Sequence, residues 1–168
     1  MASLQIVLFD ICGTECALRR DAVRELLPLP HLRRPPRLPA PVAGFFNLGG
    51  SAVPALGLDV LFGLSREATS SEADLYRHLI LVEGLTPGLP TALLVDRVED
   101  VQTIPADRLF PVREEGTLNG CVEAEIDLDG RLVHLLSLER ILLAGERQAL
   151  SELNRQAQSR LDTWSATA

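Results

Sequence analysis

The stretch ALRRDAVRELLPLP, residues 17–30, returns 75 positions later as ALLVDRVEDVQTIP, residues 92–105. Both copies begin with Ala-Leu, have Asp at the fifth position and Val at the seventh, and end on Pro. A second echo, at an offset of 80, links the apolar residues of segment 53–61 to those of segment 133–141. A chain that repeats its hydrophobic order is expected to contain two similar units of structure. The seam between two such units is the first place to look for function.

The composition excludes several classes of protein. With 168 residues, the chain is long enough for one domain or two small lobes. Hydrophobic residues make up 46% and aromatic residues 4%, which predicts an aliphatic core and no aromatic platform for stacking on bases. The formal net charge of −7 also argues against a nucleic-acid partner. All 16 basic residues are arginine, for which a bias toward GC-rich codons is a sufficient explanation.

The start of the chain has none of the marks of an exported protein. Residues 1–4 run directly into an apolar segment without the basic region of a secretion signal. There is no run of about 18 apolar residues that could insert into a membrane. We therefore expect a cytoplasmic protein. In that compartment Cys12, Cys16 and Cys121 are expected to be reduced thiols, packed as small hydrophobic residues.

Strand-like segments alternate with turns over most of the chain. Apolar and β-branched runs predict strands over 4–9, 16–18, 53–58, 79–82, 91–101, 121–126 and 131–138. Six of the eleven prolines lie in residues 28–41, which predicts an extended and exposed connection. Turn residues predict tight turns over 12–15, 44–50 and 127–130. Short or polar segments predict a helical end over 59–64, a surface loop over 65–75, and either a helical turn or a bent strand over 21–27.

The C-terminal residues have a different pattern. There is no Pro or Gly from Glu146 to Trp164, and apolar residues recur at intervals of three or four. The apolar positions are Leu150, Leu153, Ala157, Leu161 and Trp164. This spacing predicts a helix with one apolar stripe. The stripe can pack on its own domain, which is the more common arrangement, or on a partner.

The sequence contains no arrangement that is typical of an enzyme. No motif places a serine or cysteine nucleophile beside any of the three histidines, His31, His78 and His134. The glycine pair Gly49-Gly50 has no lysine after it and cannot form a phosphate-binding loop of the usual kind. We therefore expect no catalytic site and no bound cofactor, and we treat a catalytic histidine as the remaining enzyme alternative.

An acidic cluster lies within the second copy of the repeat. In a strand, Asp96 and Asp100 would lie on one face and Glu99 on the other, which does not favour a metal site. Asp96 has its echo in Asp21, and this suggests a structural role that is repeated in both units. We expect no bound metal.

The stretch GFFNLGG over residues 44–50, followed by VPALGL over 53–58, resembles a pattern of the CheW-like family, Gly-x-x-Asn-Leu-Arg-Gly-x-x-x-Pro-x-x-Asp-Leu. Residues 17–26, 93–98 and 130–138 are similar to other segments of the same family. The resemblance implies a mainly β fold, with two SH3-like five-stranded β-barrel subdomains, short helices and a C-terminal helix. It also implies a CheW-like domain over residues 4–144, beyond which the apolar spacing predicts a C-terminal helical extension over residues 146–166.

This resemblance implies an adaptor of bacterial chemosensory arrays, without catalysis. Such adaptors couple the cytoplasmic tips of methyl-accepting chemoreceptors to the regulatory domain of a CheA-type histidine kinase. One barrel end would offer apolar side chains to the kinase, and the seam between the barrels would offer a groove to a receptor helix. The residues that the resemblance assigns to protein interaction are Val23, Glu25, Gly44, Asn47, Leu48, Gly49, Gly50, Val95 and Val98.

Two positions depart from the family pattern. Gly49 stands where the family has an arginine, which is expected to pair with the glutamate that matches Glu25. The candidate substitutes for that arginine are Arg24, Arg33 and Arg34. Gly57 stands where the family has an aspartate. These departures suggest an accessory adaptor of a pilus-motility or another non-flagellar pathway. The alternative is an array-interface or competitor subunit that binds kinase or adaptor paralogues without binding a receptor.

Overall fold

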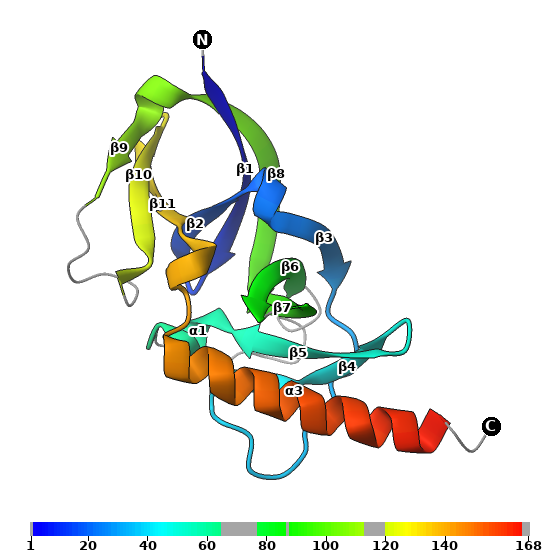
Figure 1. Ribbon diagram of the computed structural model, residues 1–168. Coiled ribbons are helices and arrows are strands. Elements are labelled where there is room, and N and C mark those ends of the chain that lie inside the picture. The colour runs from blue at the N-terminus through cyan, green and yellow to red at the C-terminus, as the bar shows by residue number, and fades with distance from the viewer. Residues whose placement is uncertain (1, 65–76, 87, 113–119, 166–168) are drawn as a thin grey trace.

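The computed structural model describes residues 2–64, 77–86, 88–112 and 120–165, and it has a mainly β fold with a long C-terminal helix (Figure 1). One sheet has six strands in the order β8-β1-β2-β11-β10-β9. The other sheet has five strands in the order β3-β6-β7-β5-β4. The predicted fold class is confirmed, with one strand more than expected in the first sheet.

The six-stranded sheet consists of β1 (Ser3–Ile11), β2 (Thr14–Arg19), β8 (Arg97–Pro105), β9 (Leu109–Pro111), β10 (Val122–Leu128) and β11 (Arg131–Leu136). The five-stranded sheet consists of β3 (Val23–Pro28), β4 (Val42–Leu48), β5 (Ser51–Gly57), β6 (His78–Thr86) and β7 (Leu89–Val95). In the described ranges, the helices are α1 (Leu58–Leu61), α3 (Ala144–Ser165) and the 3₁₀ turns η1 (Arg20–Ala22), η2 (Ala106–Arg108) and η4 (Leu138–Arg140).

The chain passes from one sheet to the other at two equivalent points, and these are the two copies of the repeated segment. The first copy leaves the six-stranded sheet as β2 and enters the five-stranded sheet as β3. The second copy makes the reverse passage, from β7 to β8, and turns at Asp96. The two repeats are therefore interleaved. The second repeat opens with β6, which lies at the same offset of 75 from β1 and belongs to the same sheet as β3, β4 and β5.

The strand registers repeat together with the sequence. The hairpin β4–β5 pairs from Val42↔Leu56 to Leu48↔Ser51, and the hairpin β10–β11 pairs from Val122↔Leu136 to Leu128↔Arg131. The paired residues of the two hairpins correspond one to one, because adding 80 to both residue numbers of a pair in the first hairpin gives a pair in the second. A register shift also occurs at the same place in both hairpins. A register is fixed by which side chains must face the core. The apolar echo in the sequence therefore reports a repeated core pattern.

Three groups of buried apolar residues form the interior. Along β1, Ile6 and Leu8 face a core that lies within the six-stranded sheet, whereas Val7 and Phe9 face a larger core that is shared with the other sheet. This alternation is the period-2 pattern of a strand that is covered on both faces. A third core lies within the five-stranded sheet around Val53. The shared core joins the two sheets along the seam.

The C-terminal helix α3 packs on its own domain, against β5 and β6 (Figure 1). Leu150 is 3% exposed and belongs to the shared core, and Leu153 and Ala157 pack against the same core. Gln158 accepts a hydrogen bond from the Ala52 N–H at 2.7 Å and donates one to the Gly50 carbonyl at 3.0 Å. The predicted helix is confirmed, and its apolar stripe covers the five-stranded sheet.

Some predicted elements differ in their bounds. The tight turn expected over 44–50 is narrower, because β4 continues to Leu48 and only Gly49 and Gly50 make the turn. The single strand expected over 91–101 is two strands with a break at Asp96. The proposed loop over 65–75 lies outside the described residues.

The proline-rich connection adds one isolated bridge to the five-stranded sheet, between Arg33 and Phe45. The corresponding pair in the other sheet, Phe110↔Glu125, belongs to the short strand β9. Pro35 and Pro36 follow the bridge and have no N–H to donate, so the pairing cannot continue. The five-stranded sheet therefore has only a remnant of a sixth strand.

Candidate protein-interaction site

The motif that carries the family resemblance forms the β4–β5 hairpin. The Asn47 side chain accepts a hydrogen bond from the Gly50 N–H at 2.8 Å, and Asp127 does the same for the Gly130 N–H at 3.1 Å in the equivalent hairpin. Gly49 and Gly50 have φ angles of 58° and 91°, which glycine adopts without strain. Leu48 is half-buried against the core of the five-stranded sheet. The asparagine and the glycines of the motif therefore build the turn.

Gly44 has a different role, since it makes room for the proline-rich connection. A Cβ atom at this position would lie 2.8 Å from the Arg33 carbonyl oxygen and 2.9 Å from the Leu32 Cβ. Those distances are far inside normal van der Waals contact. The first glycine of the motif is therefore required by the close approach of another backbone segment.

The three valines that we assigned to protein interaction lie at the seam. Val23 and Val98 occupy equivalent places just after the two crossings, opposite Val82 and Phe9 respectively. Val23 and Val95 are buried in the shared core, and Val98 is half-buried against it. Their side chains hold the two sheets together, so exposed neighbours at the seam have to make any contact with a partner.

Glu25 and Gly49 do not come together through the sheet. Glu25 is exposed on β3, at one edge of the five-stranded sheet, and Gly49 lies beyond β4, at the other edge. Among the described residues, no ion pair of Glu25 is found. Arg24, one of the candidate substitutes for the missing arginine, pairs with Glu83 at 3.0 Å instead. Arg33 and Arg34 line a separate groove.

The Asp59 carboxylate lies close to Gly57, the position where the family pattern has an aspartate. A Cβ atom on Gly57 would lie 3.0 Å from the Asp59 carboxylate oxygen. Asp59 is buried, and its carboxylate is 3.8 Å from the Arg77 guanidinium. Arg77 also lies 3.7 Å from Asp96. These charges form an ion-pair cluster between α1 and the second crossing.

Asp96 and Asp21 do not share a role, although they occupy the same place in the repeat. The Asp96 carboxylate accepts a hydrogen bond from the Cys12 N–H at 2.7 Å and so ties the β1–β2 turn to the β7–β8 crossing. Cys12 has a φ of 51°, and this bond helps to hold that unusual conformation. Asp21 is exposed in η1, and no side-chain hydrogen bond of Asp21 is found in the described part of the chain. Both residues lie at a crossing between the sheets, but among the described residues the backbone hydrogen bond of Asp96 is not repeated at Asp21.

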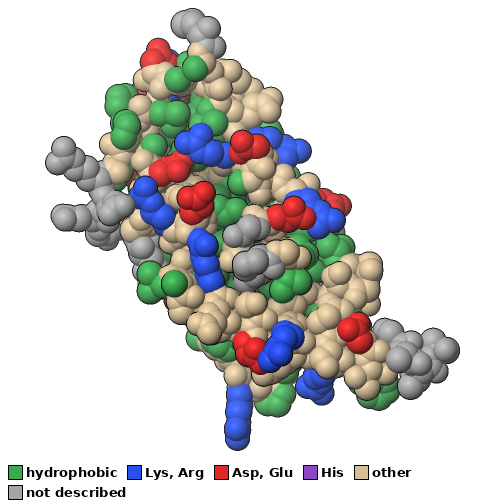
Figure 2. All heavy atoms as spheres, in the orientation of Figure 1, with side chains coloured by type: hydrophobic (Ala, Val, Ile, Leu, Met, Phe, Trp, Pro, Cys, Tyr) green, Lys and Arg blue, Asp and Glu red, His purple; other side chains and the backbone are tan. Residues whose placement is uncertain are grey.

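A groove of about 370 Å³ lies at the seam, next to the first crossing. We call it the seam groove, and its lining residues are Leu18, Arg19, Ala22, Glu83, Glu123, Leu136, Ser137, Leu138 and Glu139. Both sheets contribute, because Glu83 lies on β6 and the other strand residues lie on β2, β10 and β11. Arg19 pairs with Glu123 at 2.6 Å. Figure 2 shows acidic and basic side chains side by side across the middle of the molecule.

Sequence reasoning located the seam but missed most of the residues that form this groove. Arg19 and Glu123 lie 104 positions apart in the chain, and they meet only because β2 pairs with β11 and β11 with β10. Leu18 was within reach of sequence analysis, since it belongs to the repeated segment immediately before the crossing. The acidic residues of the seam groove, Glu83, Glu123 and Glu139, belong to no motif or repeat that would have pointed to them in the sequence.

His78 and His134 are hydrogen-bonded within the fold, and Cys16 and Cys121 are buried in it. His134 is paired with Glu125 at 2.7 Å, and His78 Nδ1 accepts a bond from the Val98 N–H at 3.5 Å. Burial raises the pKa of the Cys121 thiol to about 11 and raises that of Cys16 still further. Within the described ranges, no three His, Cys, Asp or Glu side chains are grouped so that they could hold a metal ion.

None of the helices in the described part of the chain has both the length and the hydropathy that a bilayer-spanning segment needs. The CheW-like domain family matches residues 5–146. Among solved structures, the scaffolding protein TtCheW from Thermoanaerobacter tengcongensis has a similar fold, with a TM-score of 0.75. The two sequences are 23% identical, and the match covers 87% of this chain and 97% of that chain, so this likeness speaks for the fold alone. A search of curated proteins finds no match. Since the family match covers most of its length, the chain belongs to the CheW-like family, whose members are non-catalytic scaffold and adaptor proteins of chemotaxis signal transduction.

Proposed function

We propose that this protein couples chemoreceptors to a CheA-type histidine kinase, as an accessory adaptor of a pilus-motility or another non-flagellar pathway. The observation that carries the proposal is the seam groove. An adaptor without catalysis holds its partners by shape and charge, and both sheets contribute to this groove. The absence of the family arginine at Gly49 motivates the accessory role.

The seam groove supports contact with a receptor helix. Ala22 and Leu138 are half-buried and give it apolar surface above the buried Leu18 and Leu136, and Glu83 and Glu123 give it an acidic rim. An amphipathic helix docks through an apolar stripe, and basic residues beside that stripe would complement the two glutamates. The ion pairs of these glutamates with Arg24 and Arg19 are solvent-exposed, and such pairs contribute only about 0–1 kcal/mol. A partner's basic side chains can therefore compete for them.

The open face of the six-stranded sheet supports contact with the kinase. Phe110 and Leu132 are 53% and 64% exposed. They pair with Glu125 and Asp127, which are two residues apart on β10, so both side chains lie on the same face. Figure 2 shows hydrophobic side chains gathered at the upper end of the molecule, over β9 and β10. The equivalent face of the five-stranded sheet is covered by α3, so only one lobe offers this surface.

Calorimetric titration with a kinase regulatory domain and with a receptor tip tests the proposal. Ala22→Arg places a long side chain in the seam groove, and we expect it to weaken receptor binding by about tenfold or more. Ala106→Arg is the matched control, since Ala106 is exposed in η2, another 3₁₀ turn. Leu132→Ser should weaken kinase binding, whereas Leu143→Ser, at a residue that is 70% exposed before α3, should not. Binding of neither partner by the wild-type protein at about 100 μM would contradict the proposal.

The alternative is an array-interface or competitor subunit that binds kinase or adaptor paralogues but no receptor. Gly49 favours this alternative, because the family arginine is absent there. The absence is not due to lack of space, since nothing lies within 4 Å of a Cβ atom at that position. Gly49→Arg is therefore possible, with a backbone cost of about 1–2 kcal/mol for its left-handed conformation. A gain of receptor binding in this variant, with kinase binding unchanged, would favour the alternative. Tight receptor binding by the wild-type protein would exclude it.

A further inference from the structure

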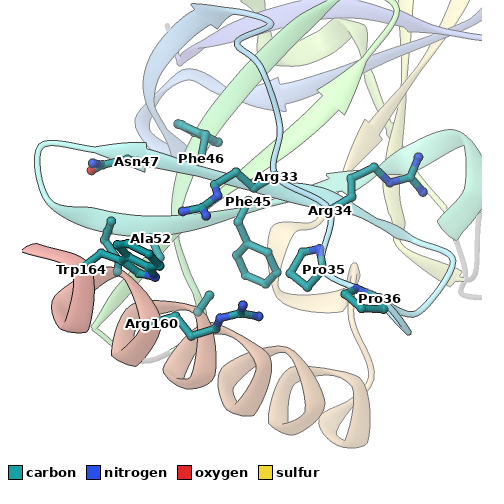
Figure 3. Close-up of a pocket in the computed structure, with 12 residues that line it drawn as sticks. Arg33, Arg34, Pro35, Pro36, Phe45, Phe46, Asn47, Ala52, Arg160 and Trp164 are labelled. Carbon is teal, nitrogen blue, oxygen red and sulfur yellow. The ribbon is translucent and has the colours of Figure 1, made fainter.

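A second groove lies outside the seam, between the proline-rich connection, the β4–β5 hairpin and the last turns of α3. We call it the arginine groove, and it has a volume of about 220 Å³. Figure 3 shows the Phe45 ring pointing from β4 toward the helix, with Pro35 beside it, Arg160 of α3 below it, and Trp164 of α3 further to the left beside Ala52. The side chain of Arg33 lies above the space between Phe45 and Trp164. The apolar floor is thus flanked by arginines on two sides.

The charges of this groove differ from those of the surface around it. Several arginines elsewhere lie within 3.0 Å of a carboxylate, in the pairs Arg19–Glu123, Arg24–Glu83, Arg131–Glu15 and Arg155–Glu152. In contrast, no ion pair of Arg33, Arg34 or Arg160 is found within the described ranges. None of the described residues that line the groove is acidic. In a protein of net charge −7, this is a local region of positive charge that its own carboxylates do not neutralise.

We propose that the arginine groove binds an acidic segment of a partner protein, with one apolar side chain of that segment packed between Phe45 and Trp164. Arginine forks hold carboxylates in fixed geometry, with two parallel hydrogen bonds. Tryptophan and arginine are also the residues that dominate binding energy at protein interfaces. Trp164 is 71% exposed although it lies on the apolar stripe of α3, so the stripe continues beyond the part that its own sheet covers.

Other occupants fit the groove less well. Pockets for small molecules are mostly about 300–1,000 Å³, larger than this groove, and bury most of the ligand. A nucleic acid would be repelled by the overall charge of −7, and only one tryptophan is present in the chain for base stacking. A short acidic peptide needs only local positive charge and an apolar slot. The proposal goes beyond the adaptor role and does not depend on it.

Trp164 is the only tryptophan of the chain, so its fluorescence reports directly on the groove. The probe is a capped peptide with a central leucine flanked by four glutamates on each side, and the matched peptide has glutamine in place of every glutamate. We expect saturable change of Trp164 emission with the glutamate peptide below about 1 mM, which corresponds to about −4 kcal/mol. The affinity should fall as salt rises from 0.05 to 0.5 M, because the Debye length shrinks to less than about 8 Å.

Charge reversal tests which arginines bind the peptide. Arg160→Glu and Arg33→Glu should each weaken binding by about tenfold, since one charge-assisted contact is replaced by a repulsive one. Arg97→Glu makes the same change of net charge at an exposed position on β8, far along the chain from the groove residues, and should change the affinity by less than about twofold. The milder variant Arg160→Gln should have an intermediate effect.

Four results would overturn the proposal. The first is equal binding of the glutamine and glutamate peptides, which would leave an apolar slot without charge recognition. The second is an effect of Arg97→Glu as large as that of Arg160→Glu, which would indicate a response to net charge alone. The third is displacement of the peptide by free glutamate or inorganic phosphate at equal concentration, which would indicate a small-anion site. Emission that changes with protein concentration alone would make a second copy of the chain the occupant. Each of these results is distinct from a failure of the kinase and receptor titrations.

Discussion

At the scale of single residues, the conformation and packing of the surrounding backbone explain the residues of the family motif. Gly44 is one of these, because a Cβ atom there would lie 2.8 Å from the Arg33 carbonyl oxygen. We predict that Gly44→Ala lowers the free energy of unfolding by about 2 kcal/mol, since neither backbone segment can move without breaking the bridge between Arg33 and Phe45. Urea unfolding followed by circular dichroism measures the change. Gly145→Ala is the matched control, because nothing lies within 4 Å of its Cβ position in α3. The control should gain about 0.5 kcal/mol, and an equal loss in both variants would contradict the steric argument.

Asp96 and Asp21 permit a second comparison at the level of residues. Asp96→Ala removes the acceptor for the Cys12 N–H and one carboxylate beside Arg77. We predict a loss of about 2 kcal/mol in the free energy of unfolding, because a partly buried N–H loses its charged partner. Asp21→Ala, at the echo position, should change stability by less than about 0.5 kcal/mol because its side chain is exposed. Equal effects in thermal unfolding would restore the idea of a repeated structural role.

Among the elements, α3 combines two functions along its length. Its first half completes the shared core through Leu150, whereas its last turns leave the sheet and form one wall of the arginine groove. We predict that Leu150→Ala lowers the free energy of unfolding by about 3 kcal/mol, since it leaves a cavity in the shared core. Leu161→Ala, at a half-buried position on the same stripe, should cost about 1 kcal/mol. If both substitutions have the same cost in urea unfolding, α3 is not divided in this way.

At the scale of the whole molecule, the interleaved strands and the shared core should make the two sheets unfold together. Ile126 is buried in the core of the six-stranded sheet, whereas Trp164 reports on the other sheet through α3. We predict that Ile126→Ala lowers the midpoint of the Trp164 fluorescence transition and that of circular dichroism equally, with a cost of about 3 kcal/mol. Two separated transitions would show instead that each sheet unfolds as an independent unit.

The sequence alone predicted the mainly β class, the C-terminal helix, the family and the existence of a repeat. It did so because periodic apolar positions report which side chains face a core, and this pattern survives in the residues 17–30 and 92–105. The two residues that break the family pattern, Gly49 and Gly57, were also visible in the sequence. Their structural consequences were not visible there. The Asp59 carboxylate beside Gly57 was found only in the folded chain.

The tertiary structure decided how the two repeats are combined and which surfaces they leave open. A repeat of apolar positions is compatible with two separate units or with interleaved ones, because both bury the same side chains. The crossings at η1 and Asp96 place both copies in both sheets. The seam groove and the arginine groove each consist of residues from distant parts of the chain, such as Arg19 with Glu123 and Arg33 with Arg160. Local spacing determined the elements of this protein, and long-range packing determined its surfaces, because charges that meet only in space leave no periodic trace in a sequence.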